Sequence, residues 1–171
     1  IVLMDTVLAG ATTYSLRQPI ILEDEVRVLW CCNNKGSMRR DIIVYSYPYT
    51  DVNTFTLEFL NEKRDAVLSR IVKGSVEGAY MGTEYKVMPP QMRRVAVQDS
   101  VQAYEIRGLW KILNGEAMGG PYVSHTRLDQ VNGRVVSAET FLYAAGQKKR
   151  TALRQAEAIL YTLTLPEDTI K

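Results

Sequence analysis

The stretch between residues 101 and 143 constrains the fold most, because it holds three strand-like runs with only short connections between them. In Val101–Lys111, apolar and polar side chains alternate: one face carries Tyr104, Ile106 and Trp110, and the other carries Glu105, Arg107 and Lys111. This period is typical of a half-buried strand. Pro121–Leu128 and Arg134–Tyr143 follow. Short turns can join antiparallel strands, whereas parallel strands need a longer crossover. The stretch therefore predicts an antiparallel sheet.

Asn132 and Gly133 predict the tip of a hairpin, because a type I′ turn needs positive φ at both central positions. A two-residue loop would place Val131 opposite Arg134 and Thr126 opposite Glu139. For the neighbouring run, the alternation predicts that Trp110 lies in the core beneath a helix.

The remaining elements follow from their own patterns. We expect further strands at Tyr14–Leu16, Val26–Trp30, Asp41–Tyr47 and Tyr80–Val87. Thr56–Lys73 predicts a helix with Thr56 as its N-cap and an apolar stripe that Arg64 interrupts. Lys148–Leu163 predicts a closing helix. The expected fold class is α+β: a mostly antiparallel sheet of about seven strands packed against two long helices.

The 171 residues suit one domain. We expect residues 1–12 to be the trailing end of an upstream helix, 13–166 to be a single α+β domain, and 167–171 to be a tail. The net charge of +2 argues against a nucleic-acid binder. The longest run without a charged residue, Thr6–Leu16, is too short to be a transmembrane segment.

Catalytic and metal chemistry find little support in the sequence. His125 is the single histidine, and it lies within a strand pattern with no nucleophile motif around it, so we interpret it as an ordinary strand residue. Cys31 and Cys32 are adjacent and lack a CxxC spacing, which favours small buried hydrophobic residues. A site made of Asp51, Glu77 and Glu84 stays open, without a recognised ligand spacing. We predict no catalytic residue, metal or cofactor.

Several segments are candidates for binding. Tyr45, Tyr47 and Tyr49 alternate, so they form either a half-buried row or an aromatic binding face, with Asp51 close behind. Gly119 and Gly120 form either a tight turn or a place where a ligand approaches the backbone.

Basic side chains at two places in the sequence also have two interpretations each. Arg107 is either a structural ion-pair partner or a binding residue. Lys148, Lys149 and Arg150 precede the last helix, as a solvated linker or as an anion-binding patch.

Five strings resemble a bacterial family catalogued as domain of unknown function 4837: YSYPYTDVNTFT, EGAYMGTE, RGLWK, MGGPYVS and KRTALRQAEAILYTL. The resemblance covers about Tyr14 to Leu165. It implies an exported, periplasmic or lipid-anchored protein roughly twice this length, of which the chain is the C-terminal half. No catalytic residue can be carried over, because none is established for the family. The order of elements is also similar to Mog1/PsbP-type sandwiches, an analogy of fold that carries no function.

These observations favour a non-enzymatic interaction or scaffolding module of the cell envelope. Its partner would be another envelope protein or the missing N-terminal half. The alternative is a small-ligand-binding domain that uses the Tyr45/Tyr47/Tyr49 face or the Gly119-Gly120 loop.

Overall fold

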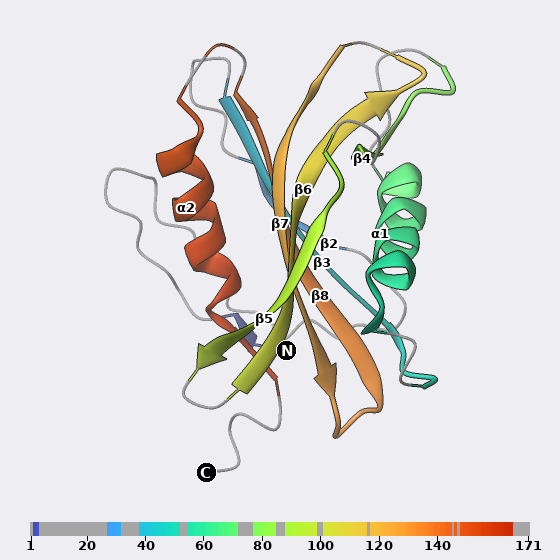
Figure 1. Cartoon of the computed structure of the whole chain (residues 1–171), viewed down its shortest axis with the longest axis vertical. Helices are drawn as coiled ribbons and strands as arrows, with labels where there is room; N and C mark the ends of the chain where they lie inside the picture. Colours follow the sequence, from blue (N-terminus) through green and yellow to red (C-terminus); the bar gives the residue numbers. More distant parts are fainter. Residues whose placement is uncertain are drawn as a thin grey trace.

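The fold is a twisted antiparallel sheet that lies between two helices, as a computed structural model of the chain shows (Figure 1). The structure describes residues 2–3, 27–31, 38–51, 55–71, 77–84, 88–98, 101–115, 117–144, 146 and 148–165. Helix α1 (Leu57–Ile71) covers one face of the sheet, and helix α2 (Arg150–Leu160) covers the opposite face. In this part of the chain, neither helix is long and apolar enough to cross a bilayer.

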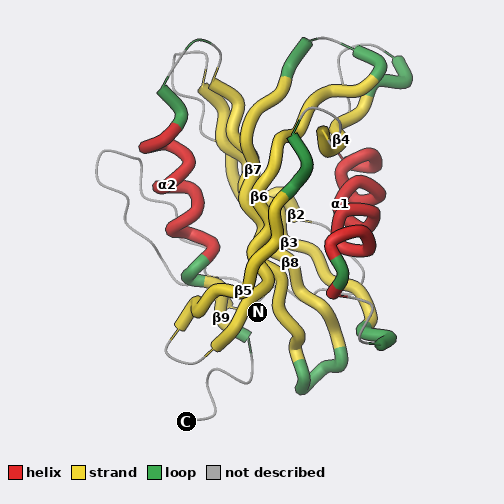
Figure 2. Tube along the Cα trace, in the orientation of Figure 1, coloured by secondary structure: helices red, strands yellow, loops and turns green. Residues whose placement is uncertain are grey.

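In the part of the chain that the structure describes, seven strands form the main sheet (Figure 2). Their spatial order is β2 (Arg27–Cys31), β3 (Met38–Pro48), β8 (Arg134–Ala144), β7 (Gly119–Asp129), β6 (Val101–Leu113) and β4 (Tyr80–Glu84), with β5 (Gln91–Gln98) also paired to β6. All of these pairings are antiparallel. The outer edge of β6 is therefore shared by two strands, with β5 along its first half and β4 along its second.

The sheet buries side chains on both faces, because each face carries a helix. The face toward α1 contributes Ile43, Tyr45, Ile106, Trp110, Tyr122 and Phe141, which pack with Leu60, Val67 and Leu68 of the helix. The opposite face contributes Ile42, Val44, Val123, Val136 and Ala138, which pack with Leu160, Leu163 and Leu165. Adjacent residues of one strand thus enter different halves of the core.

The ends of α1 follow from its sequence. Thr56 caps the helix: the backbone N–H of Phe59 donates to its Oγ1 at 3.3 Å, and the N–H of Leu60 donates to its carbonyl oxygen at 3.0 Å. Helix α2 has no such side-chain cap at Lys149. The described part of α1 has 15 residues, and the expected helix end at Lys73 lies outside the described residues, whereas α2 has 11 residues and is shorter than its pattern predicts.

The predicted antiparallel sheet with two helices is confirmed, although its strands differ in part from the expected ones. The strand Gln91–Gln98 was not predicted, because consecutive Arg93 and Arg94 break the alternation. Expected strand Tyr14–Leu16 lies outside the described residues. Ile106 and Trp110 are buried beneath α1, as their alternation predicts.

The hairpin between β7 and β8 forms at the expected place with a different register. Asp129 pairs with Arg134 and Thr126 with Ser137, so the loop has four residues and the predicted pairs are wrong by two positions. The cause is Asp129, whose carboxylate accepts from the backbone N–H of Asn132 at 3.1 Å and from its Nδ2 at 2.8 Å. Only Gly133 of the turn pair has positive φ, at 61°.

The described parts of the two ends meet in a second, small sheet. Strand β1 (Val2–Leu3) pairs antiparallel with β9 (Leu163–Thr164), so Val2 and Leu3 are extended where the sequence predicts a helix end. The other residues of 1–12, and the expected tail 167–171, lie outside the described residues. The closing helix ends at Leu160 because Leu163 and Thr164 turn into this pairing.

Candidate functional site: a groove along helix α1

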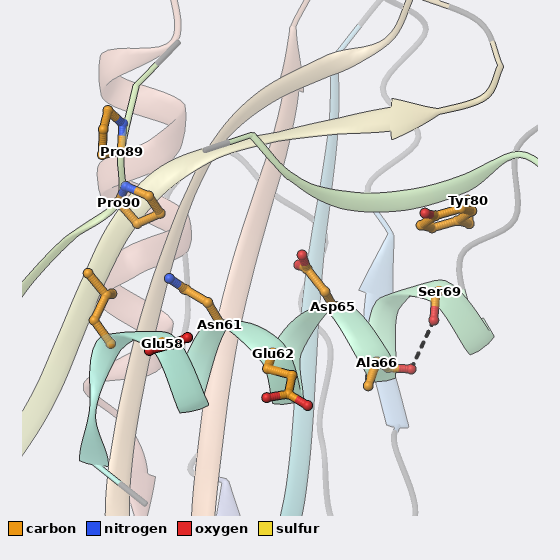
Figure 3. A pocket seen from close by; sticks show the side chains of 10 residues that line it. Glu58, Asn61, Glu62, Asp65, Ala66, Ser69, Tyr80, Pro89 and Pro90 are labelled. Atoms are coloured by element: carbon orange, nitrogen blue, oxygen red, sulfur yellow. Dashed lines mark hydrogen bonds between the residues drawn. The ribbon is translucent and has the colours of Figure 1, made fainter. Parts of the chain in front are cut away.

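A groove of about 1080 Å³ runs between α1 and the chain that lies over it (Figure 3). One wall is the helix from Leu57 to Ser69, and the other is Tyr80 of β4 together with Pro89 and Pro90, which directly precede β5. The described side chains of the wall opposite the helix are apolar, apart from the tyrosine hydroxyl. A groove with apolar walls and a few polar groups is the usual form of a binding site.

The helix wall is acidic. Glu58, Glu62 and Asp65 line the groove, and no lysine or arginine stands among its described lining residues. Asp65 is held in place, since its Oδ1 accepts from the backbone N–H of Thr83 at 3.0 Å and from Thr83 Oγ1 at 2.5 Å. Glu58 and Glu62 are exposed and lie one helical turn apart. The described lining of the groove is therefore acidic, although the whole chain is net positive.

Asn61 lies between these carboxylates and is 5% exposed. The Nη1 of Arg64 donates to Asn61 Oδ1. Because a guanidinium can only donate, this contact fixes which end of the amide is the oxygen. Figure 3 shows the amide nitrogen pointing across the groove toward Pro90, and it has no hydrogen-bond partner among the described residues.

Beneath Asn61 lies a buried network centred on Arg64 and Glu139, which are 1% and 0% exposed. Arg64 Nε donates to Glu139 Oε1 at 2.8 Å, and Arg64 Nη1 donates to the hydroxyl of Tyr122 at 3.0 Å. The hydroxyl of Tyr45 also donates to Glu139 Oε1, at 3.1 Å. The guanidinium lies 4.4 Å from the centre of the Tyr122 ring. Arg64 is thus held from several sides.

The electrostatics keep this network in one protonation state. Burial alone lowers the pKa of Arg64, but the charge of Glu139 outweighs it, so the pKa lies above its ordinary value. Burial raises the pKa of Tyr122 to about 12. At neutral pH the guanidinium therefore stays charged and the tyrosine keeps its proton, and the contact that orients Asn61 persists.

A second polar cluster lies on the other face of the sheet, beneath α2. His125 Nε2 and Glu105 Oε2 are 3.2 Å apart, and Glu105 Oε1 accepts from Arg107 Nε at 2.6 Å and from Arg93 Nε at 2.8 Å. Arg107 also pairs with Glu157 of α2. Burial opposes ionisation of Glu105, but hydrogen bonds from His125, Arg107 and Arg93 outweigh it and hold its pKa well below the usual range.

This second cluster does not fit a metal. Glu105, His125 and Glu157 form the one group of potential ligands found among the described residues, with their ligand atoms within 4.8 Å of one another. Arg107 lies between the two carboxylates and, with Arg93, supplies the positive charge that a cation would bring. The cluster is an ion-pair network that joins α2 to β6.

The tyrosine row proposed from the sequence lies on the face of α1. Tyr45 is buried in the core, and the rings of Tyr45 and Tyr47 stack with centres 6.3 Å apart. Tyr47 also contacts Phe59 of α1, at 6.0 Å. Tyr49 packs on Phe55, which stacks on Tyr104 at 4.8 Å. The aromatic rings of this row therefore pack on one another, and none of them lines the groove.

Gly119 and Gly120 lie at the start of β7, where the sheet is packed too closely for a side chain. A Cβ on Gly120 would stand 1.8 Å from the carbonyl oxygen of Leu142, and one on Gly119 would stand 2.5 Å from that of Trp110. Trp110 Nε1 donates to the same Leu142 oxygen at 3.3 Å, crossing β7 at Gly120. The space beside both glycines is occupied by the protein itself.

The other candidates do not join the groove either. Asp51 and Glu77 are exposed outside it, and the side chain of Glu84 lies outside the described part of the structure. Cys31 ends β2 as expected, whereas Cys32 lies outside the described residues. Lys149 flanks α2, which has no acidic residue in its first turn.

No sequence pattern predicts the groove. Its one visible signal is Arg64, which interrupts an otherwise apolar stripe and so predicts a buried partner for its charge. That partner, Glu139, comes 75 residues later and shows no pattern of its own.

Comparison with known proteins identifies a family and gives no activity. No curated protein matches the chain. One solved structure, of an uncharacterised protein from Rhizobium leguminosarum, is similar over 74% of this chain and 96% of that one, with 12% sequence identity and a TM-score of 0.27. The model of the family described as Domain of unknown function (DUF4837) matches residues 10–162. The chain therefore belongs to that family.

Proposed function

We propose that the domain is a non-enzymatic binding module whose groove along α1 takes a positively charged segment of a partner protein. The observation that carries this proposal is the combination of an apolar wall, Tyr80 with Pro89 and Pro90, and an acidic helix wall that carries Glu58 and Glu62, with no lysine or arginine among the described lining residues. Lysine and arginine side chains suit such a groove, because their long aliphatic stems pack on apolar surface while the charged ends reach carboxylates.

The size of the groove suits a short segment of chain. From Leu57 to Ser69 the helix rises about 18 Å, at about 1.5 Å per residue. An extended peptide rises about 3.3 Å per residue, so about five residues would follow the whole wall. Proline at the opposite wall offers an apolar surface with no N–H of its own to satisfy.

The test is a binding titration with a defined probe. The fluorescein-labelled peptide Ser-Lys-Leu-Lys-Leu-Ser is titrated with the protein and followed by fluorescence anisotropy at low and physiological salt. Glu58→Gln/Glu62→Gln should weaken binding about fivefold, as expected for two exposed ion pairs worth about 0.5 kcal/mol each. Binding should also weaken as salt rises.

Asp51→Asn/Glu77→Gln is the matched control, since it removes two exposed carboxylates that do not line the groove. The control should bind the probe like the unchanged protein. Equal losses in both double variants would mean that the probe responds to overall charge, and no loss in the groove variant would mean that it binds elsewhere; either result refutes the proposal.

An envelope location is part of the same proposal and is supported by the sequence resemblance alone. Fractionation of cells that express the tagged full-length protein tests it, with recovery in the membrane or periplasmic fraction as the expected result. Recovery in the cytoplasmic fraction would contradict it.

A further inference from the structure

We infer that Asn61 is the residue that makes the groove specific for an extended peptide, because it presents a fixed donor to a backbone carbonyl oxygen of the bound segment. The inference rests on the proposed function and deepens it. The acidic wall alone would attract any cation, including a polyamine. Asn61 adds a requirement that only a ligand with a suitably placed acceptor can meet.

The first step is the orientation of the amide. Arg64 Nη1 occupies Asn61 Oδ1, so the nitrogen is the end that faces the groove. Asn61 is 5% exposed, and its amide nitrogen lacks a partner among the described residues. The nitrogen itself is not among the buried polar atoms that lack a partner, so it opens onto the groove. A ligand oxygen at this position would therefore meet an available donor.

The second step is rigidity. Arg64 is itself held by Glu139 and by the hydroxyl of Tyr122, and all three side chains are buried. The amide therefore cannot flip without leaving a buried guanidinium N–H unpaired. A donor fixed before binding costs less to order in the complex. Arg64, Glu139 and Tyr122 are positioning residues, since they act on the ligand only through Asn61.

The third step is spacing. Glu58 and Glu62 are four residues apart on α1, or about 6 Å along the helix axis. In an extended peptide, side chains two residues apart lie on the same side and about 6.6 Å apart. The groove therefore matches cations at alternate positions of the segment. Asn61 lies between the two carboxylates in the sequence, where the backbone joining such cations would pass.

The experiment compares two probes on one substitution. Asn61→Asp keeps an oxygen for Arg64 but replaces the donor by a charged acceptor. It should weaken binding of Ser-Lys-Leu-Lys-Leu-Ser about fivefold, the effect of one hydrogen bond, and should tighten binding of spermine, which has charge but no carbonyl. Ser-Lys-Lys-Leu-Leu-Ser, with the same composition and adjacent lysines, should bind the unchanged protein more weakly than the alternating probe.

A change on the ligand side covers the case in which Asn61→Asp fails to fold. Replacing each amide bond of the alternating probe in turn by an E-alkene removes one carbonyl, together with the N–H bonded to it, at a time. One position should lose about fivefold in affinity for the unchanged protein, and the other positions less.

The two proposals fail in different ways. If Asn61→Asp increases the affinity for the peptide as much as the affinity for spermine, or if no alkene position loses more affinity than the others, the groove binds cations without a hydrogen bond to a peptide carbonyl. Either result overturns this inference alone. Equal affinity for the two lysine arrangements would overturn the spacing argument. If Glu58→Gln/Glu62→Gln leaves both probes unaffected, the proposed function fails as well.

Discussion

Replacing Arg64 by methionine tests whether the buried network beneath α1 stabilises the fold as a unit. Methionine keeps most of the aliphatic length and removes the charge. Glu139, which is 0% exposed, would then keep its carboxylate in the core without the guanidinium, and Tyr122 and Asn61 would each lose a hydrogen bond. We expect a loss of about 3–5 kcal/mol, the usual cost of removing one partner of a buried ion pair. Total stabilities are about 5–15 kcal/mol, so the loss is readily measurable.

The informative comparison is a double-mutant cycle. Glu139→Met should be destabilising by itself, because it leaves the guanidinium unpaired. Arg64→Met/Glu139→Met removes both charges, so it should be less destabilised than the sum of the single variants by about 2 kcal/mol or more. Urea unfolding followed by circular dichroism gives the free energies. If the single losses add to within about 0.5 kcal/mol, the two residues act independently and the reasoning is wrong.

Three further predictions concern other parts of the fold. Trp110→Ala should cost about 3–5 kcal/mol, and in a Trp30→Phe background the emission of Trp110 should be blue-shifted and poorly quenched by acrylamide; strong quenching with normal melting would contradict its burial. Gly133→Val should lower the melting temperature, because the backbone φ of 61° is unfavourable for a β-branched residue; no atom lies within 4 Å of a new Cβ, so a steric clash would not contribute. Gly133→Asn should lower it less, because asparagine tolerates this conformation. Equal melting temperatures of the two variants would contradict the assignment of backbone strain to this residue. The lowered pKa of Glu105 means that its ion pairs stabilise the fold above the unfolded pKa of about 4.3, and that this stabilisation is lost as the pH falls from there toward the folded pKa. Glu105→Gln should therefore reduce the dependence of the free energy of unfolding on pH below about 4.3, measured by urea titration. An unchanged pH dependence would refute the assignment.

The elements that could be predicted from the sequence are those whose signals are local. Thr56 caps α1 through its own side chain, and the alternation around Trp110 directly reports which face is buried. The hairpin position followed from Gly133, which has the positive φ that its turn requires. The register of the hairpin could not be predicted in the same way, because the hydrogen bond from Asn132 Nδ2 to the Asp129 carboxylate favours a four-residue loop over the two-residue loop.

What escaped prediction depends on contacts between distant residues. Strand β5 has no clear alternation and is extended because it pairs with β6. The groove needs α1 and Pro90 to meet, and neither segment predicts the other. Asn61 looks like an ordinary polar residue of a helix until the contact with Arg64 shows which end of its amide is free.

The division of the outer edge of β6 between two strands has a consequence for local unfolding. Strand β4 is tied to α1 by the bonds between Asp65 and Thr83, whereas β5 pairs with β6 alone among the described strands. The two strands can therefore open as separate cooperative units, and amides of β5 should exchange with solvent sooner than those of β4. Pro89 and Pro90 directly precede β5, so a segment bound between them and α1 would slow exchange in a strand that it does not touch.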